Sequence, residues 1–150
     1  MRGLAPALLL LVSLAGCGGS GAPANAYLTG VEVHDETVRF EFESSPRQVR
    51  ARYEQRSRLA ECGSGRPVRV RGDAFVVVHF QPAASAKLDG EKVVMTYTGP
   101  KRLRGTGPVL EAAKSCDFEA DLGWAIGLER RLPIDVTRDG STVTVRFRTP

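Results

Sequence analysis

A row of three carboxylates is the part of the chain whose residue types come closest to a catalytic or metal site. Asp117, Glu119 and Asp121 alternate with apolar residues in the stretch Cys116–Leu128, so on a strand they share one face. A hydrolytic carboxylate pair needs one group with a raised pKa beside an ionised partner, and consecutive outward positions offer no such contrast. Loop-type calcium sites need a glycine-bearing spacing of oxygen ligands that is absent here. We therefore expect a solvated strand face, and keep a hydrolase as a minor alternative.

No other arrangement of residues indicates catalysis. The sequence has no GxSxG or HExxH motif and no glycine-rich phosphate loop in a strand-to-helix setting. His34 and His79 stand alone, and no CxxC motif or histidine cluster suggests a metal site. We predict a protein that is not an enzyme and that has no metal or cofactor.

Arginines are concentrated in the region between residues 47 and 71. Alternation places Arg50 with Arg52, and Arg69 with Arg71, on one face of each of two expected strands. If these strands are neighbours, the four side chains form a basic patch suited to carboxylates or phosphates of wall polymers or lipid headgroups. The alternative is that the arginines keep edge strands soluble and unpaired.

The beginning of the chain indicates export. A positive start and an apolar run over residues 4–15, too short to span a bilayer, are typical of a secretory signal peptide. The run ends in LAGC, with the cysteine at position 17. This resembles the lipobox of bacterial lipoproteins, in which the cysteine receives a diacylglyceryl group and the chain is cut just before it. We expect residues 1–16 to be a cleaved lipoprotein signal peptide and Cys17 to carry lipid; an ordinary signal peptide with an incidental cysteine is the alternative.

Lipid at Cys17 would determine where the protein works. Each buried methylene contributes about 0.8 kcal/mol, so two or three acyl chains anchor a protein stably. Residues 17–26, rich in Gly, Ser, Ala and Pro, are predicted to be a flexible tether. We expect the protein on the outer face of the cell membrane, with the membrane as a partner and nucleic acid excluded. The formal charge of +4 falls to +3 (4 − 1) when Arg2 is removed, a mild basic bias.

Two further cysteines, Cys62 and Cys116, remain once Cys17 is assigned to lipid. In an oxidising exported setting such a pair is most simply a disulfide. The two positions are 54 apart (116 − 62), and closing a loop of this size stabilises a fold by about 4 kcal/mol in the chain-entropy model. Two buried free thiols are the alternative.

The body of the chain alternates with period two, which predicts an all-β fold. Half-buried strands are expected at 37–44, 48–54 and 67–72, a strand covered on both faces at 74–81, and one strand over Cys116–Leu128. Asp89-Gly90 and Asp139-Gly140 are tight-turn pairs. The last strand is expected to turn Val143, Val145 and Phe147 inward.

The order of these pieces resembles the AMIN-like domain lipoproteins of high-GC Gram-positive bacteria. The resemblance runs from about Tyr27 to Phe147 and includes LTGVEV before the strand VRFEF, then GSGRPVRVRGDAFVVVHFQPA, YTGPKRL and DFEADLGWAIGLERRLPIDV. The chain departs from the family where HDETVRF replaces a Phe-Asp-Arg segment, and where STVTVRFRTP replaces a Val-rich last strand with Pro and Arg.

The resemblance implies a β-sandwich of two small sheets over residues 27–150, without catalytic residues, located in the cell envelope. It implies binding to peptidoglycan or to envelope partners, but no binding residue can be transferred from the family. Our leading prediction is a non-catalytic, lipid-anchored protein that contacts an anionic cell-wall polymer through Arg50, Arg52, Arg69 and Arg71. The alternative is an interaction module for another envelope protein; a wall hydrolase is the minor one.

Overall fold

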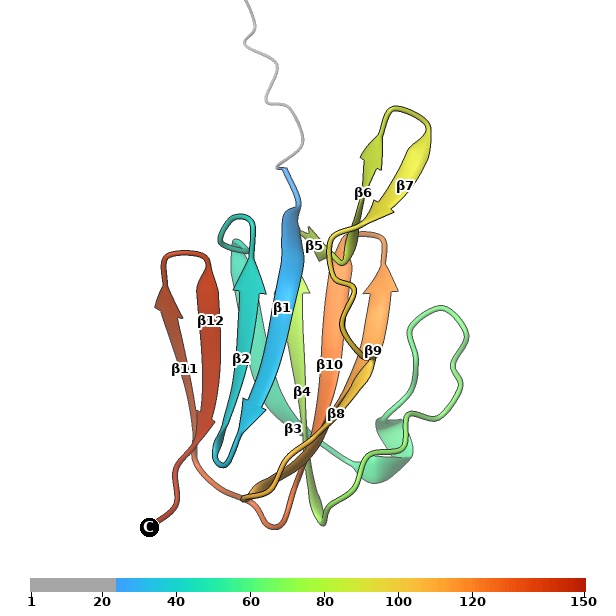
Figure 1. Ribbon diagram of the computed structural model, residues 1–150. Coiled ribbons are helices and arrows are strands. Elements are labelled where there is room, and N and C mark those ends of the chain that lie inside the picture. The colour runs from blue at the N-terminus through green and yellow to red at the C-terminus, as the bar shows by residue number, and fades with distance from the viewer. Residues whose placement is uncertain (1–23) are drawn as a thin grey trace, which may run out of the picture.

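The computed structural model describes residues 24–150 and consists of two β-sheets packed face to face (Figure 1). The predicted signal peptide (1–16), Cys17 and most of the predicted tether (17–26) lie outside the described residues. Among the described residues, no helix has the length and apolar character needed to cross a membrane.

The first sheet has the strand order β11-β12-β2-β1-β5. Its strands are β1 (Ala26–His34), β2 (Thr37–Phe42), β5 (Ala83–Ala84), β11 (Ile134–Asp139) and β12 (Thr142–Phe147). Neighbours are antiparallel except β1 and β5, which are parallel. The predicted inward residues of the last strand, Val143, Val145 and Phe147, are buried, which confirms that prediction.

The second sheet has the order β3-β4-β10-β9-β8. Its strands are β3 (Gln48–Glu54), β4 (Ala74–Gln81), β8 (Arg102–Arg104), β9 (Val109–Phe118) and β10 (Asp121–Leu128). A short hairpin of β6 (Ala86–Asp89) and β7 (Lys92–Met95) stands apart from both sheets, and a single 3₁₀ turn, η1 (Arg56–Arg58), follows β3.

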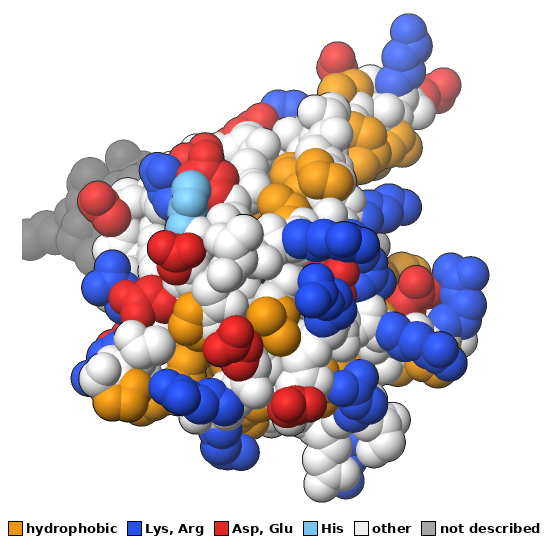
Figure 2. Space-filling model, turned by 60° about the horizontal axis from the view of Figure 1, so that its bottom comes forward, with side chains coloured by type: hydrophobic (Ala, Val, Ile, Leu, Met, Phe, Trp, Pro, Cys, Tyr) orange, Lys and Arg blue, Asp and Glu red, His pale blue; other side chains and the backbone are white. Residues whose placement is uncertain are grey.

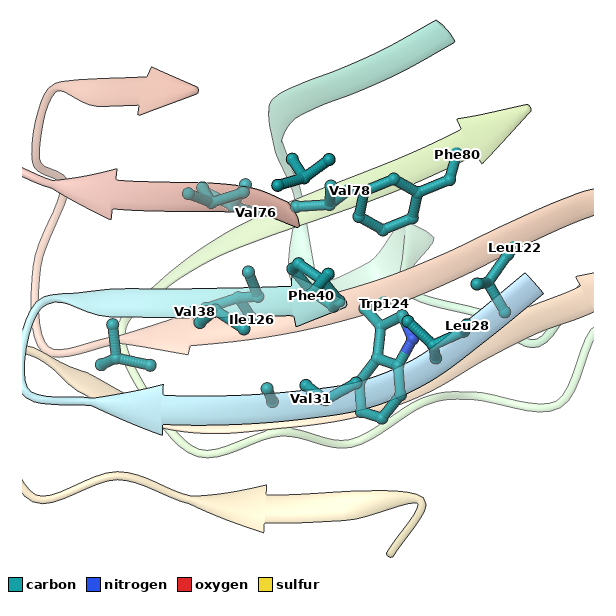
Figure 3. Close-up of a cluster of buried hydrophobic side chains, with 14 of the residues drawn as sticks. Leu28, Val31, Val38, Phe40, Val76, Val78, Phe80, Leu122, Trp124 and Ile126 are labelled. Carbon is teal, nitrogen blue, oxygen red and sulfur yellow. The ribbon is translucent and has the colours of Figure 1, made fainter. Parts of the chain in front are cut away.

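An aromatic cluster fills the space between the sheets (Figure 3). The ring centroid of Phe40 on β2 lies 4.8 Å from that of Phe80 on β4 and 5.9 Å from that of Trp124 on β10. All three side chains are fully buried, so they interlock the two sheets. Such tilted and edge-on pairs add to the free energy gained by burying apolar area. The predicted all-β sandwich of two sheets is confirmed.

The outer face of the second sheet is also covered. As predicted for residues 74–81, β4 is apolar on both faces, with Phe75 and Val77 pointing away from the sandwich core. The chain between β3 and β4 crosses this face and buries Leu59, Val68 and Val70 against it. A sheet whose central strands are apolar on both faces needs such a second cover.

The prediction of a regular strand at residues 67–72 is wrong. The alternation is real, because Val68 and Val70 are buried while the arginines between them are exposed. The segment makes no strand ladder, however, and pairs only through an isolated bridge between Ala60 and Pro67. Alternation here reflects a chain lying flat on a sheet rather than a strand within one.

The prediction of a single strand over Cys116–Leu128 is also wrong. Glu119 and Ala120, with φ of +49° and +60°, form the turn between β9 and β10. Two consecutive positive φ values fit a hairpin turn, which favours Gly, Asn or Asp, and Glu119-Ala120 carries none of these. Trp124 is inward as expected, whereas Phe118, expected on the same face, is 56% exposed.

The predicted disulfide between Cys62 and Cys116 is present. It ties the covering segment to β9, and the backbone N–H of Cys62 also donates to the carbonyl of Ser115 (3.1 Å). Gly123 on β10 leaves the space for it, because a Cβ there would lie 2.9 Å from the Cβ of Cys116. The covering segment is therefore held by a covalent bond in addition to its apolar contacts.

Replacing both Cys62 and Cys116 with Ala should lower the free energy of unfolding by about 4 kcal/mol, because the 54-residue loop is then open in the unfolded chain. Guanidinium chloride unfolding measures this. A reductant should shift the parent midpoint toward that of the variant and leave the variant unchanged. Val136→Ala, at an exposed site on β11, should change stability by less than about 0.5 kcal/mol. A parent that is insensitive to reductant would contradict the prediction.

Candidate binding groove

An open groove of about 980 Å³ lies at the end of the sandwich opposite the point where the described chain begins. Its walls are the end of β3, the start of β4 and the loop after β10, segments that are distant in sequence. Figure 2 turns this end forward and shows Lys and Arg side chains interspersed with Asp and Glu. The side chains that matter most for its chemistry are Tyr53, Glu54, Arg56, Phe75, Glu129 and Arg131.

Tyr53 holds one wall in place. Its hydroxyl donates to the carbonyl of Leu132 (2.5 Å) and accepts from the backbone N–H of the same residue (2.8 Å). The guanidinium carbon of Arg131 lies 4.0 Å from the centre of the tyrosine ring. A cation over an aromatic face is attracted by the ring quadrupole. The guanidinium is therefore positioned by the ring beneath it, with N–H groups left to donate at its edge.

Phe75 and Arg56 repeat this arrangement on the other wall. The guanidinium carbon of Arg56 lies 4.4 Å from the centre of the Phe75 ring. Nη2 of Arg56 donates to the carbonyl of Gly72 (2.7 Å), which leaves its other N–H groups available. The groove thus contains two arginines that are each placed over a ring. Sequence reasoning missed both, because only the fold brings Arg56 to Phe75 and Arg131 to Tyr53.

Carboxylates lie beside these arginines. Glu54 pairs with Arg52 (Oε2 to Nη2, 3.6 Å). Asp73 and Glu129 also line the groove, and their backbone N–H groups donate to the carbonyls of Leu128 at the end of β10 and of Pro108. Guanidinium edges donate to carboxylates, often in pairs of bonds, and carboxylates accept from hydroxyl and ammonium groups. The groove therefore suits a ligand that carries both charges and many hydroxyl groups, rather than a purely anionic chain.

The four arginines predicted to bind do not lie on two neighbouring strands. Arg50 and Arg52 are exposed on β3, and Arg52 reaches the groove through Glu54. Arg69 and Arg71 lie on the chain that crosses the outer face of this sheet, where the Arg69 carbonyl accepts a hydrogen bond from Arg102 of β8 (2.6 Å) and the Arg71 backbone lies over Gly127 of β10. Because β4 lies between β3 and β10, this segment is not a neighbour of β3. The expected neighbouring strands are absent because residues 67–71 form no strand.

A buried carboxylate explains where the second pair of arginines lies. Glu111 on β9 has a side chain that is 5% exposed, and it accepts from Arg102 (3.0 Å) and from the backbone N–H of Arg71 (2.8 Å). An unpaired buried carboxylate would be costly, so these partners are required. Because Glu111 is contacted by the backbone N–H of Arg71, the guanidinium of Arg71 stays exposed to solvent.

The predicted row of carboxylates is divided among three different surroundings. Asp121 contacts Nδ1 of His79 (2.9 Å), and Glu119 lies in the β9–β10 turn. Asp117 accepts hydrogen bonds from Lys114 (2.9 Å) and from the hydroxyl of the fully buried Ser85. Among residues 24–150, no three metal-binding side chains are grouped so that they could hold an ion.

The hydrogen bonds of Asp117 decide its ionisation. Burial raises the pKa of Asp117, but the hydrogen bonds from Lys114 and Ser85 outweigh burial, and the pKa lies below its usual range. A catalytic acid needs a raised pKa, so Asp117 is unsuited to that role. It serves instead to join β9 to the segment that leads into the β6–β7 hairpin.

Comparison with known proteins relates these features to a family. The family model of the AMIN-like domain matches residues 29–145, most of the chain and both sheets. The chain belongs to the AMIN-like domain family. This confirms the AMIN-like part of the resemblance found in the sequence, while its lipoprotein and high-GC Gram-positive parts stay predictions. No curated protein and no solved structure matches the chain.

Membership gives this AMIN-like domain a general role. AMIN-like domains are as a rule non-catalytic binding modules, and they indicate a cell-wall or envelope-binding function outside the cytoplasm. A groove with positioned charges of both signs is consistent with such a module. The prediction that Arg50, Arg52, Arg69 and Arg71 bind polymer stays a prediction.

Asp117→Asn should make the AMIN-like domain less stable at neutral pH, because the ionised carboxylate loses its charge-assisted bonds. A carboxylate with a lowered pKa stabilises the fold above its unfolded pKa of about 3.9, and this contribution is lost as pH falls through the lower folded value. The stability difference between parent and variant should therefore shrink below about pH 4. Urea unfolding across pH measures it. Glu119→Gln, in the exposed turn, is the control, and a difference that does not change with pH would contradict the assignment.

Proposed function

We propose that this AMIN-like domain is a non-catalytic module, anchored by lipid at Cys17, that binds a peptidoglycan-like polymer in the groove. The observation that supports it is the pair of arginines placed over Tyr53 and Phe75 among carboxylates. Peptidoglycan combines sugar hydroxyls with peptide carboxylates and ammonium groups. A groove of mixed charge matches this combination better than it matches a uniformly anionic chain.

The place of the groove in the fold is consistent with this role. The described chain begins at the opposite end, at Ala24, seven positions after Cys17 in the sequence (24 − 17). A domain held at one end by lipid presents its other end to the wall. Arg52 pairs with Glu54 of the groove, whereas Arg50, Arg69 and Arg71 do not line it. We therefore propose Arg52, Arg56 and Arg131 as the main arginines that contact the polymer.

Changing Arg56 and Arg131 together to Glu should lower retention on purified sacculi by at least about tenfold, since one lost hydrogen bond to a charged group is worth roughly 1.5–3 kcal/mol. The protein is purified from membranes in detergent, and retention is measured by co-sedimentation at increasing salt. Exposed charge contacts weaken with salt, so parent retention should fall as salt rises.

Arg69→Glu with Arg71→Glu is the matched control, because it makes the same charge change outside the groove. It should leave retention within about twofold of the parent. Equal losses of retention in the two double variants would indicate general electrostatic attraction and would refute polymer binding in the groove. A parent that is not retained at low salt would refute polymer binding altogether. Circular dichroism checks that each variant is folded.

Intact-mass measurement of the protein from membranes tests the anchor. We expect loss of residues 1–16, added acyl mass on Cys17, and the two-hydrogen deficit of the disulfide between Cys62 and Cys116. Cys17→Ser should move the protein out of the membrane fraction, since acyl chains supply the binding. A variant that partitions with membranes as the parent does would contradict lipid attachment at this residue.

A partner-binding role is the second candidate, favoured by the edge strand β11. Its four C-terminal residues are exposed, and within residues 24–150 β12 is its one neighbour in the sheet, so its other edge can accept a strand from another protein. Crosslinking in cells after wall digestion separates the two functions. A single dominant protein partner would favour this candidate, and loss of all crosslinks with the wall would favour polymer binding.

A further inference from the structure

The hairpin of β6 and β7 presents apolar side chains to solvent. Leu88 and Val93 face each other across the hairpin and are 71% and 69% exposed, and Met95 shares their face beside Ala86. Of the six large apolar side chains exposed in the described residues, four belong to this hairpin. Figure 1 shows it projecting beyond the sandwich. A patch of this kind marks an interaction site in a folded protein.

The direction of the hairpin is set by its base. The N–H groups of Thr96 and Tyr97 donate to the carbonyl of Ser85 (2.9 and 3.2 Å), and the Ser85 hydroxyl is bonded to Asp117 and Lys114. Exposed apolar residues on a loose loop can collapse onto the domain. Here the base keeps the hairpin extended, so its apolar face stays available.

The hairpin begins next to the point where the chain enters the domain. Ala26 and Tyr27 pair with Ala83 and Ala84, which lead directly into the hairpin. Tyr27 and the hairpin residues Leu88, Val93 and Met95 line one open groove of about 670 Å³ at this end. The start of the described chain and the apolar hairpin therefore belong to the same end of the molecule.

The length of the tether limits what can lie against this face. Ala24, where the described chain begins, is seven positions after Cys17 (24 − 17), and a fully extended chain of that length spans at most about 25 Å. A domain tied this closely keeps its anchored end near the bilayer. The short tether also raises the effective concentration of the hairpin at the lipid surface, so a weak contact is enough.

We propose that the β6–β7 hairpin docks on the membrane, inserting Leu88, Val93 and Met95 into the interfacial region of the lipid bilayer. The inference rests on the proposed anchor at Cys17 and goes beyond the proposed polymer binding. The charged side chains of the hairpin are two lysines, one aspartate and one glutamate, which cancel. The contact is therefore apolar, and it differs little between zwitterionic and anionic lipid. It fixes the groove at the other end toward the wall.

A tryptophan reporter tests the docking. Trp124 is the one native tryptophan and is fully buried, so it gives a constant background. Leu88→Trp protein, purified from membranes with its acyl mass verified, is reconstituted into phosphatidylcholine vesicles with or without bromine on the acyl chains. We expect brominated lipid to reduce the emission of the Leu88→Trp reporter at least twofold. The matched control, Val136→Trp on β11, should be unaffected.

Acrylamide, which quenches tryptophan that is exposed to water, distinguishes the possible locations of the hairpin. Quenching by brominated lipid together with protection from acrylamide supports docking. Quenching by acrylamide alone places the hairpin in water and overturns the proposal. Protection from both quenchers indicates cover by a second copy or another protein and also overturns it. Adding phosphatidylglycerol should change the lipid quenching less than twofold; a larger increase would overturn the apolar mechanism.

Failure of docking is distinguishable from failure of the proposed function. A chain without acyl mass on Cys17 refutes the anchor and docking together. The variant with Arg56→Glu and Arg131→Glu should lose retention on sacculi. If brominated lipid still quenches the Leu88→Trp reporter in this variant, docking is independent of polymer binding. Acylated protein whose Leu88→Trp reporter stays in water refutes docking alone.

Discussion

The two-sided apolar character of the second sheet is the constraint on which the rest of the structure depends. Inward residues such as Val76 and Trp124 pack against the first sheet, and outward residues such as Phe75 and Val77 need a separate cover. The chain between β3 and β4 supplies that cover. Gly127 makes it possible, because a Cβ there would lie 1.7 Å from the carbonyl oxygen of Arg71. The covering chain passes directly over a glycine of β10.

This cover also determines where the functional groups lie. By crossing the sheet, the covering segment carries Arg56 to the groove and places Arg69 and Arg71 over the strands beyond β4. Strands of about eight residues, roughly 26 Å long, then separate the groove from the end with the hairpin. The apolar hairpin and the mixed-charge groove are thus at opposite ends of one rigid sandwich, which suits a module between two different surfaces of the envelope.

Alternation along the chain was sufficient to predict several strands and the hairpin at Asp139-Gly140, because a half-buried strand needs apolar residues at every second position. It failed at residues 67–72, where a chain lying on a sheet has the same pattern. It failed again at Glu119-Ala120, a turn without the usual residues. The groove was not predictable, since a ring and a guanidinium far apart in sequence show no local pattern. The glycines of β10 were the available signal for a close crossing.

The sequence alone determined the all-β class, the disulfide pair that remains once Cys17 is set aside, and the family. These follow from local chemistry and short-range periodicity, which can be read without the fold. Tertiary structure alone decided which faces are covered, that Arg50 and Arg71 are not on neighbouring strands, and that an apolar hairpin projects beside the point where the chain enters the domain. The physical reason is that burial is a property of pairs of surfaces. A residue pattern states that a face must be covered, and only the folded chain selects the segment that covers it.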